Sequence, residues 1–274
     1  MLFQINGIRF EMREPHDLSF LLPYGQVFKV MDQLVSGNLC FGVEGSYGRL
    51  FVKYAGAPAV NATIPPVEAV ITLRRAAERY PVHPALPRLL THGPVGNGYA
   101  AFYEWVDGEP LRDENTLQVS DAVYTLPVLE KLRMLEKVFS LHLRLAETGW
   151  MAVDLSPRNL LINMDQPDIH VCDIDLYRQY PCQNLTGWLP GEADFLSPEE
   201  LEKGATIDQR ATVWKLGRLA ALLMGDPSLQ GHTVYTPQPL LPVILKASAA
   251  DPDKRYETVS SFVAAWRAAI AELF

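Results

Sequence analysis

Residues 152–163 read AVDLSPRNLLIN, and residues 170–175 read HVCDID. The first stretch places a carboxylate, Asp154, and an amide, Asn159, five positions apart around a proline-containing turn, and the apolar run that follows would anchor this turn. The second stretch is a short strand that delivers another carboxylate, Asp173. Carboxylate and amide oxygens are the ligands that Mg²⁺ prefers. The two stretches therefore predict a loop that gathers oxygen ligands near the middle of the chain.

A lysine upstream of this loop lies on a predicted strand. Lys53 follows the apolar residues 50–52, and the turn residues GSYG at 45–48 precede them. An ammonium group in this setting can neutralise phosphate oxygens. The alternative is an edge-strand lysine that discourages aggregation.

The pattern of the chain changes from strands to helices. Short apolar runs separated by glycine predict strands at residues 27–30, 39–43, 50–54, 86–90 and 99–106. The pair Pro65-Pro66 opens a helical pattern that runs to residue 79. Helical spacing of apolar residues then predicts helices at 126–145, 211–224, 240–249 and 258–273. We expect an α+β chain with a β-rich front (residues 1–103), a linker (104–108) and an α-helical back (109–274).

Composition excludes several classes of protein. The 274 residues include 24 Lys and Arg against 32 Asp and Glu, a net charge of −8, so nucleic acid is not an expected partner. The N-terminus lacks the pattern of a secretory signal, and the apolar runs are too short to span a bilayer. The three cysteines form no Cys-x-x-Cys pair, so neither a disulfide framework nor a zinc site is indicated. We expect a cytoplasmic protein without a membrane partner.

The motifs together resemble the protein kinase superfamily over nearly the whole chain. That family carries H-R-D-L-x-x-x-N and then D-F-G; here Ala152-Val153-Asp154 with Asn159, and Asp173-Ile174-Asp175, occupy those places. Residues 102–108 (FYEWVDG) look like the hinge. Three later stretches resemble the end of the activation segment, the D-V-W-S-L-G helix start and the D-P-x-x-R-Y of bacterial Ser/Thr kinases: residues 191–199, 213–217 and 251–256.

This resemblance implies a bilobal fold with ATP in a cleft between a small β-rich lobe and a larger helical lobe. It implies that Asp154 accepts the hydroxyl proton and that Lys53, supported by a carboxylate, holds the phosphates. Asn159 and Asp173 would hold Mg²⁺. The remaining nucleotide contacts that the resemblance implies are Glu68 as the partner of Lys53, with Glu78 as its rival, and Gly37, Val43, Glu104, Val106 and Leu161.

The resemblance also implies a buried ion pair between Glu199 and Arg255 that braces the activation segment. We expect a protein Ser or Thr hydroxyl as the acceptor, since the D-P-x-x-R-Y motif is similar to that of bacterial Ser/Thr kinases. Ser156 and Glu192 replace the lysine and threonine that usually help to fix this hydroxyl. The missing lysine at Ser156 and the Asp173-Ile174-Asp175 motif suggest the alternative of a small-molecule acceptor, as in aminoglycoside-type kinases.

Other departures favour a third hypothesis, a pseudokinase that serves as a binding module. The glycine loop, SGNLCFGV at residues 36–43, lacks three regularly spaced glycines. Ala152 and Val153 replace the usual His-Arg, and Thr212 replaces the aspartate that tethers the catalytic loop. Without that arginine, no familiar receptor awaits an activation-segment phosphate, so we expect no switching by phosphorylation of that kind.

Overall fold

The computed structural model describes residues 1–112, 122–225 and 236–274. The chain forms two compact units, Met1–Val106 and Asp107–Phe274, and each is described by itself. The division between the units falls inside the linker expected at residues 104–108. The α+β class predicted from the sequence is confirmed.

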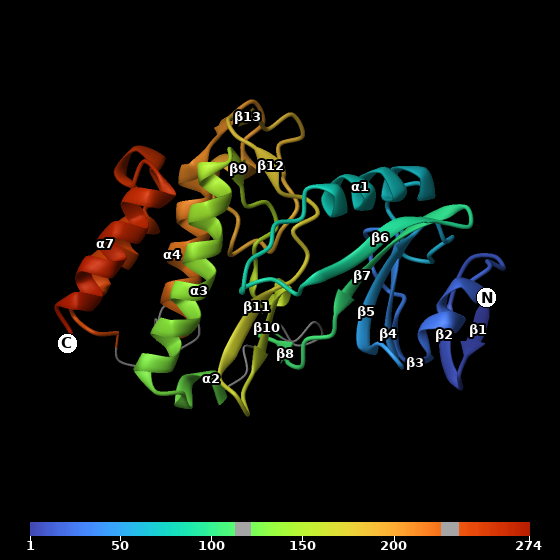
Figure 1. The fold of residues 1–274 in the computed structure, drawn as a ribbon. Helices are drawn as coiled ribbons and strands as arrows, with labels where there is room; N and C mark the ends of the chain where they lie inside the picture. The colour runs from blue at the N-terminus through green and yellow to red at the C-terminus, as the bar shows by residue number, and fades with distance from the viewer. Residues whose placement is uncertain (113–121, 226–235) are drawn as a thin grey trace. The chain divides into compact units, whose positions relative to one another are not determined.

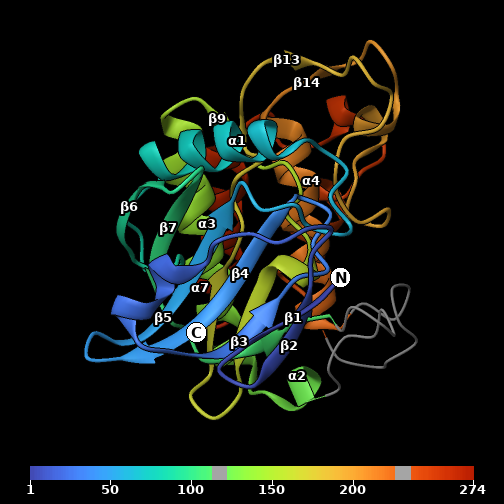
Figure 2. The same ribbon diagram turned by 90° about the vertical axis from the view of Figure 1, so that its right-hand side faces the viewer.

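The first unit is built on a five-stranded antiparallel sheet with the strand order β3-β4-β5-β7-β6, shown in Figure 2. Its strands are β3 (Gln26–Met31), β4 (Asn38–Gly45), β5 (Gly48–Ala55), β6 (Leu89–Val95) and β7 (Gly98–Glu104). Four of the strands match the predicted runs. The expected strand at 86–90 is wrong in position, because pairing begins only at Leu89, after Pro87, which has no N–H to donate to a ladder.

Helix α1 (Pro66–Glu78) and the N-terminal segment cover opposite faces of this sheet. The N-terminal cover consists of β1 (Leu2–Ile5), β2 (Ile8–Glu11) and the 3₁₀ helix η1 (Ser19–Tyr24). Side chains of a strand alternate between the two faces. Along β5, Val52 and Tyr54 therefore face the N-terminal cover, while Phe51 and Ala55 face α1. Lys53 must then lie on the α1 face.

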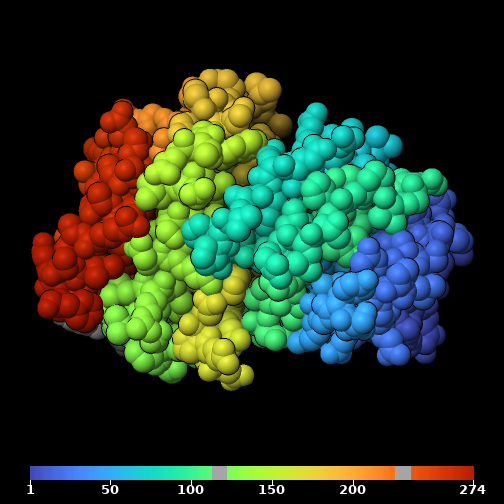
Figure 3. All heavy atoms as spheres, in the orientation of Figure 1, coloured from blue at the N-terminus to red at the C-terminus, as the bar shows by residue number. Residues whose placement is uncertain are grey.

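The second unit is mainly helical, as predicted. Its helices are α2 (Ala122–Thr125), α3 (Val128–Glu147), α4 (Gln209–Met224), α6 (Leu241–Ala247) and α7 (Val259–Ala271). Figures 1 and 3 show α7 beside α3, and rings from these two helices, Phe139, Phe262 and Trp266, stack edge-on in the core. Among the described residues, no helix combines the length and apolar character needed to cross a bilayer.

Short elements fill the rest of the second unit. The strands are β8 (Glu109–Pro110), β9 (Trp150–Met151), β10 (Leu160–Asn163), β11 (Asp168–Val171), β12 (Arg178–Gln179), β13 (Cys182–Gln183) and β14 (Thr206–Ile207). The 3₁₀ helices are η2 (Pro157–Asn159), η3 (Pro198–Leu201) and η4 (Pro252–Lys254). Strand β10 pairs with both β8 and β11, so the loop that precedes β10 and the one that follows β11 leave the same small sheet.

The sheet of the first unit offers a matched test of close packing. A Cβ added at Gly98 would overlap the carbonyl oxygen of Ala55 and meet the hydroxyl of Tyr54, whereas one added at Gly93 would meet no atom within 4 Å. We expect Gly98→Ala to lower the free energy of unfolding by about 1–3 kcal/mol, because overpacking forces a backbone shift. Gly93→Ala is the control. Urea denaturation of both variants measures the difference, and equal stabilities would contradict this packing.

Candidate active site

The small hairpin of β10 and β11 brings the two carboxylates of the predicted site together. Leu160 pairs with Val171, and the N–H of Cys172 donates to the carbonyl of Asn159 at 2.7 Å. The hairpin therefore joins the end of the Asp154–Asn159 loop to the start of the Asp173 loop. These three residues, proposed from the sequence as one set, lie in one place in the structure.

Both aspartates adopt the left-handed backbone conformation, with φ of 61° at Asp154 and 63° at Asp173. Side chains other than glycine rarely occupy this region, and such residues cluster at functional sites, where the surroundings fix them. The side-chain nitrogen of Asn159 donates to the carbonyl of Asp154 at 2.8 Å. This bond braces the turn and leaves the amide oxygen of Asn159 as a candidate metal ligand.

A hydrogen bond from Ala152 to Thr212 supports the loop that carries Asp154. The Thr212 hydroxyl accepts the N–H of Ala152 at 3.0 Å, and both residues are buried. The sequence reasoning treated Thr212 only as the loss of the usual aspartate. The structure shows that the threonine keeps one hydrogen bond of a tether, so this departure from the family pattern does not leave the loop unsupported.

The carboxylate of Asp154 is hard to ionise in its surroundings. Burial, the neighbouring charge of Asp173 and, more weakly, that of Glu192 raise its pKa to about 6. A hydrogen bond with Asn159 and the positive charge of Lys215 act in the opposite direction. A carboxylate with a raised pKa is a stronger base than an ordinary aspartate, as proton acceptance from a hydroxyl requires.

A buried His–Tyr pair lies near the same carboxylates. The hydroxyl of Tyr177 and Nε2 of His142 are 2.8 Å apart, and Nδ1 of His142 is 2.8 Å from the carbonyl of Val138. A carbonyl can only accept, so Nδ1 carries a proton and donates to Val138, and Nε2 faces the hydroxyl of Tyr177. Burial, with the charges of Asp154 and Asp173, raises the pKa of Tyr177 well above its ordinary value. The sequence reasoning missed this pair, because its two halves are 35 positions apart.

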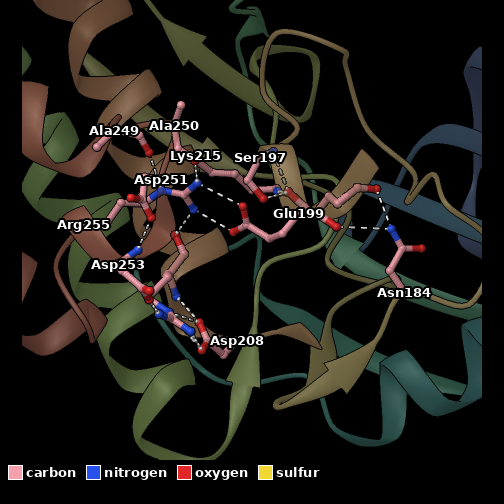
Figure 4. Close-up of polar contacts among 12 residues, drawn as sticks. Asn184, Ser197, Glu199, Asp208, Lys215, Ala249, Ala250, Asp251, Asp253 and Arg255 are labelled. Atoms are coloured by element: carbon pink, nitrogen blue, oxygen red, sulfur yellow. Dashed lines mark hydrogen bonds and ion pairs between the residues drawn. The ribbon is translucent and has the colours of Figure 1, made fainter. Parts of the chain in front are cut away.

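Figure 4 shows the polar contacts that hold the end of the activation segment. Glu199 and Arg255 form the predicted ion pair through two bonds of 2.7 and 3.0 Å, and this prediction is confirmed. Arg255 also donates to the carbonyls of Ala249 and Ala250, and its guanidinium lies 5.0 Å from the ring centre of Trp214. The guanidinium is thereby satisfied on several sides although it is buried.

A second ion pair was not predicted. Lys215 and Glu200 are fully buried and pair with each other, and Glu200 also accepts from the N–H and hydroxyl of Ser197. Ser197 and Glu200 form a capping box at η3. The S-P-E-E sequence was the available signal, because Ser followed three residues later by Glu marks such a box. Asn184, also buried, donates to the carbonyl of Glu200 at 2.9 Å.

In the first unit, Lys53 is buried on the α1 face of the sheet, but the structure does not bring Glu68 to it. Glu68 is exposed in the first turn of α1, and no ion pair to it is found among the described residues. The reason is the helix period: α1 turns Ala69 and Leu73 toward the sheet, so the neighbouring Glu68 faces away. The rival, Glu78, pairs with Arg74 at 2.7 Å.

Val43, predicted as a nucleotide contact, also lies on the wrong face of its strand for that role. Its side chain is buried in the core beneath the N-terminal cover, the face opposite to Lys53. The strand period of two explains the error, because Gly42, one position earlier, shares the face of Lys53. Gly37 has a φ of 75°, and a Cβ there would contact Ala69 at 3.4 Å. Gly37 thus forms a turn packed against the start of α1.

The remaining residues predicted to contact the nucleotide differ in burial and in which of their polar groups already have hydrogen-bond partners. The Glu104 side chain forms a two-bond pair with Arg88, so only its backbone is suited to recognise a base. Among the described residues, the backbone of Val106 makes no hydrogen bond. Leu161 is half-buried on β10 between two buried neighbours. Asp175 is buried.

The oxygen ligands offered by Asn159 and Asp173 suit a divalent cation that is coordinated mostly by water and substrate phosphates. Within the described residues, no three His, Cys, Asp or Glu side chains form a metal cluster. Mg²⁺ is usually bound by one or two carboxylates together with waters and substrate phosphates, so a three-ligand cage is not required. Asp173 and the amide oxygen of Asn159 fit this description.

Comparison with known proteins points to one family. No protein-family model matches the chain. The chain is similar to the serine/threonine-protein kinase PknB of Mycolicibacterium smegmatis, with 28% identity over 211 residues, or 65% of this chain and 32% of that protein. For PknB of Mycobacterium tuberculosis the identity is 27% over 210 residues, with 65% and 32% covered. For PrkC of Bacillus subtilis it is 25% over 205 residues, with 66% and 31% covered.

The fold class, the order of the motifs and these relatives agree. They support membership of the protein kinase superfamily, because the similar proteins are bacterial Ser/Thr protein kinases at 25–28% identity. The matched part spans 31–32% of the length of these relatives. What the relatives do as whole proteins is therefore carried to this chain only as a proposal.

The raised pKa of Asp154 predicts a gain of stability when its charge is removed. Its pKa is about 6 in the folded chain against an ordinary 3.8, so its contribution to stability is full below 3.8 and is lost as pH rises through 6. We expect Asp154→Asn to raise the free energy of unfolding by about 1–3 kcal/mol at pH 8, without nucleotide or metal. The gain should shrink toward pH 5. Chemical denaturation at both pH values measures it, and a gain that grows toward pH 5 would contradict the assignment.

The Arg255–Glu199 pair predicts a large loss of stability when one partner is removed. We expect Arg255→Met to lower the free energy of unfolding by about 3–5 kcal/mol, because a carboxylate remains without its partner in a buried place. Arg267, which pairs with Glu136 on the exposed side of α7 and α3, is the control. Arg267→Met should cost less than about 1 kcal/mol. Similar losses in the two variants, measured by urea denaturation, would argue against a bracing role for Arg255.

Proposed function

We propose that the chain transfers the γ-phosphoryl group of Mg-ATP to a Ser or Thr hydroxyl of a protein. The observation that carries this proposal is the convergence of Asp154, Asn159 and Asp173 on one hairpin, with both aspartates in left-handed backbone. Strained residues with oxygen ligands and a base of raised pKa form the arrangement that phosphoryl transfer to a hydroxyl needs.

Each residue has a distinct task in this proposal. Asp154 orients the incoming hydroxyl and accepts its proton, and its raised pKa makes it the stronger base for this step. Asp173 and the amide oxygen of Asn159 hold Mg²⁺. Lys53 binds the phosphate oxygens, and burial strengthens its charge interactions. Bound Mg²⁺ would offset the negative charge on the phosphates during transfer.

The base of the nucleotide would be recognised by backbone groups of the first unit. We assign this role to Glu104 and Val106, whose side chains need not take part, and to the apolar side chain of Leu161. Gly42 replaces Val43 as the proposed β4 contact, because it shares the face of Lys53. Gly37 remains a proposed contact through its turn. Glu68 is left without a role at Lys53.

A protein acceptor is proposed because the relatives are named as Ser/Thr protein kinases. The acceptor side of the site differs from the usual pattern, since Glu192 lies beside the catalytic loop and Ser156 is buried. These two residues are the ones that a change of acceptor would involve.

We expect purified chain to transfer labelled phosphate from Mg-ATP to a generic protein such as casein or myelin basic protein. Asp154→Asn should reduce turnover by about 10³-fold or more, because proton acceptance and orientation of the hydroxyl are both lost. The same variant should retain nucleotide binding, measured by the thermal shift with Mg-ATP. Lys53→Met should instead weaken the binding of Mg-ATP. Arg267→Met, which changes an exposed ion pair, is the control and should behave like the wild type in both assays.

The alternative hypotheses give different results in this assay. Phosphate transfer to a metabolite or an aminoglycoside but to no protein would replace the acceptor with a small molecule. A thermal shift with Mg-ATP but no transfer to any acceptor would favour a binding module. Full turnover by Asp154→Asn would refute the role of Asp154.

A further inference from the structure

Arg112 joins two carboxylates of the activation segment that the sequence did not connect with it. Its Nη1 and Nη2 donate to the two carboxylate oxygens of Asp194 at 3.0 and 2.8 Å, and Nη1 also pairs with Glu192. Only 6% of Arg112 is exposed. The partners are 80 and 82 positions away in the sequence, so no local pattern reveals this contact.

One of the two carboxylates that Arg112 binds, that of Glu192, also bonds to the loop that carries Asp154. Glu192 accepts the backbone N–H of Arg158, within the catalytic loop, at 3.2 Å. Its backbone carbonyl accepts the N–H groups of Phe195 and Leu196 at 2.8 and 3.0 Å. One residue earlier, a Cβ built on Gly191 would lie 3.7 Å from the Cα of Asp154. The activation segment therefore contacts the loop that carries the base.

Arg112 stabilises the ionised form of Asp194. Burial opposes ionisation of Asp194, but hydrogen bonds and the positive charge of Arg112 hold its pKa below the ordinary value. Arg218 donates to the backbone carbonyl of Asp194 at 3.1 Å. The guanidinium of Arg112 also lies 5.8 Å from the ring centre of Phe195. A planar guanidinium can bind a carboxylate through two parallel bonds and stack on a ring, and lysine cannot do both.

We propose that Arg112 is a positioning residue for phosphoryl transfer, which fixes residues 191–195 against the catalytic loop by binding Glu192 and Asp194. The two carboxylates of the chain then do permanently what an added phosphate could do for a segment facing an arginine. This inference rests on the proposed function, and it adds to it the residue that sets the acceptor side of the site. Glu192, placed where a threonine would be usual, acquires a reason for being acidic.

The test compares Arg112→Gln with Arg112→Lys and Asp194→Asn. Hydrogen exchange of the amides of Phe195 and Leu196, without nucleotide, reports on the segment itself. We expect Arg112→Gln to speed this exchange about tenfold or more, because the segment opens more often. Arg112→Lys should fall between this variant and the wild type. Asp194→Asn, which leaves Arg112 in place, gives a smaller change of the same kind and serves if Arg112→Gln does not fold.

Transfer kinetics separate positioning from a general loss of structure. We expect Arg112→Gln to lower kcat about 10–100-fold, since a displaced acceptor reacts slowly, while the KM for Mg-ATP changes less than about twofold. Arg267→Gln, at the exposed α3–α7 pair, is the matched control and should match the wild type in both measurements.

The outcomes distinguish this inference from the proposed function. Unchanged exchange at Phe195 and Leu196 in Arg112→Gln would overturn the role of Arg112, whatever the activity. So would accelerated exchange spread evenly over the chain, or a rise in the KM for Mg-ATP with unchanged kcat. A wild-type chain that transfers no phosphate would refute the proposed function, and it would remove the positioning role in catalysis even if the exchange result held.

Discussion

Asp154 and Asp173 repel each other, and the second unit is arranged so that both can remain in place. The charge of Asp173 helps to raise the pKa of Asp154, and both residues are held in left-handed backbone. Strain and like-charge repulsion persist only where the surrounding structure fixes the residues. The β10–β11 hairpin, the Asn159 side chain and the Thr212 hydroxyl supply that fixation.

A buried lysine also acts on the Asp154–Asp173 pair. Lys215, paired with Glu200, offsets part of the negative charge at Asp154. The hydroxyl of Tyr177 adds a polar but uncharged neighbour, because its raised pKa keeps the proton on the oxygen. A site that is to hold Mg²⁺, as proposed, needs such negative charge, and the cation in turn would offset the charge of the phosphates. The cost is borne by the fold, so a charge-neutral Asp154 variant should be the more stable protein but the poorer catalyst.

Features encoded by nearby residues could be predicted, and features that join distant parts could not. The catalytic loop, the main helices and most strands follow from local periods and turns. The pairing of Glu199 with Arg255 was predicted from the family resemblance, and the structure confirms it. The roles predicted for Val43 and Glu68 were wrong because a shift of one residue changes the direction of a side chain. In a strand it moves the side chain to the other face, and in a helix it turns the side chain by about 100°.

The contacts of Arg112 and Lys215 could not be predicted from the sequence for a different reason. Both residues find their carboxylates only after the chain has folded, and a basic residue in a sequence is equally compatible with a solvated surface. The N-terminal hairpin was missed because its four-residue strands are half exposed and show no strong period. These are tertiary properties, and local propensity is a weak guide to them.

The ion pairs of the activation segment share one logic. Arg112 holds Glu192 and Asp194, Lys215 holds Glu200, and Arg255 holds Glu199, so four acids of one segment meet three bases from elsewhere in the same unit. All three bases are buried, where ion pairs are shielded little by salt. A segment fixed in this way has its negative charge built into the sequence. Because these acids already have basic partners, the positioning proposed for this segment does not require an added phosphate.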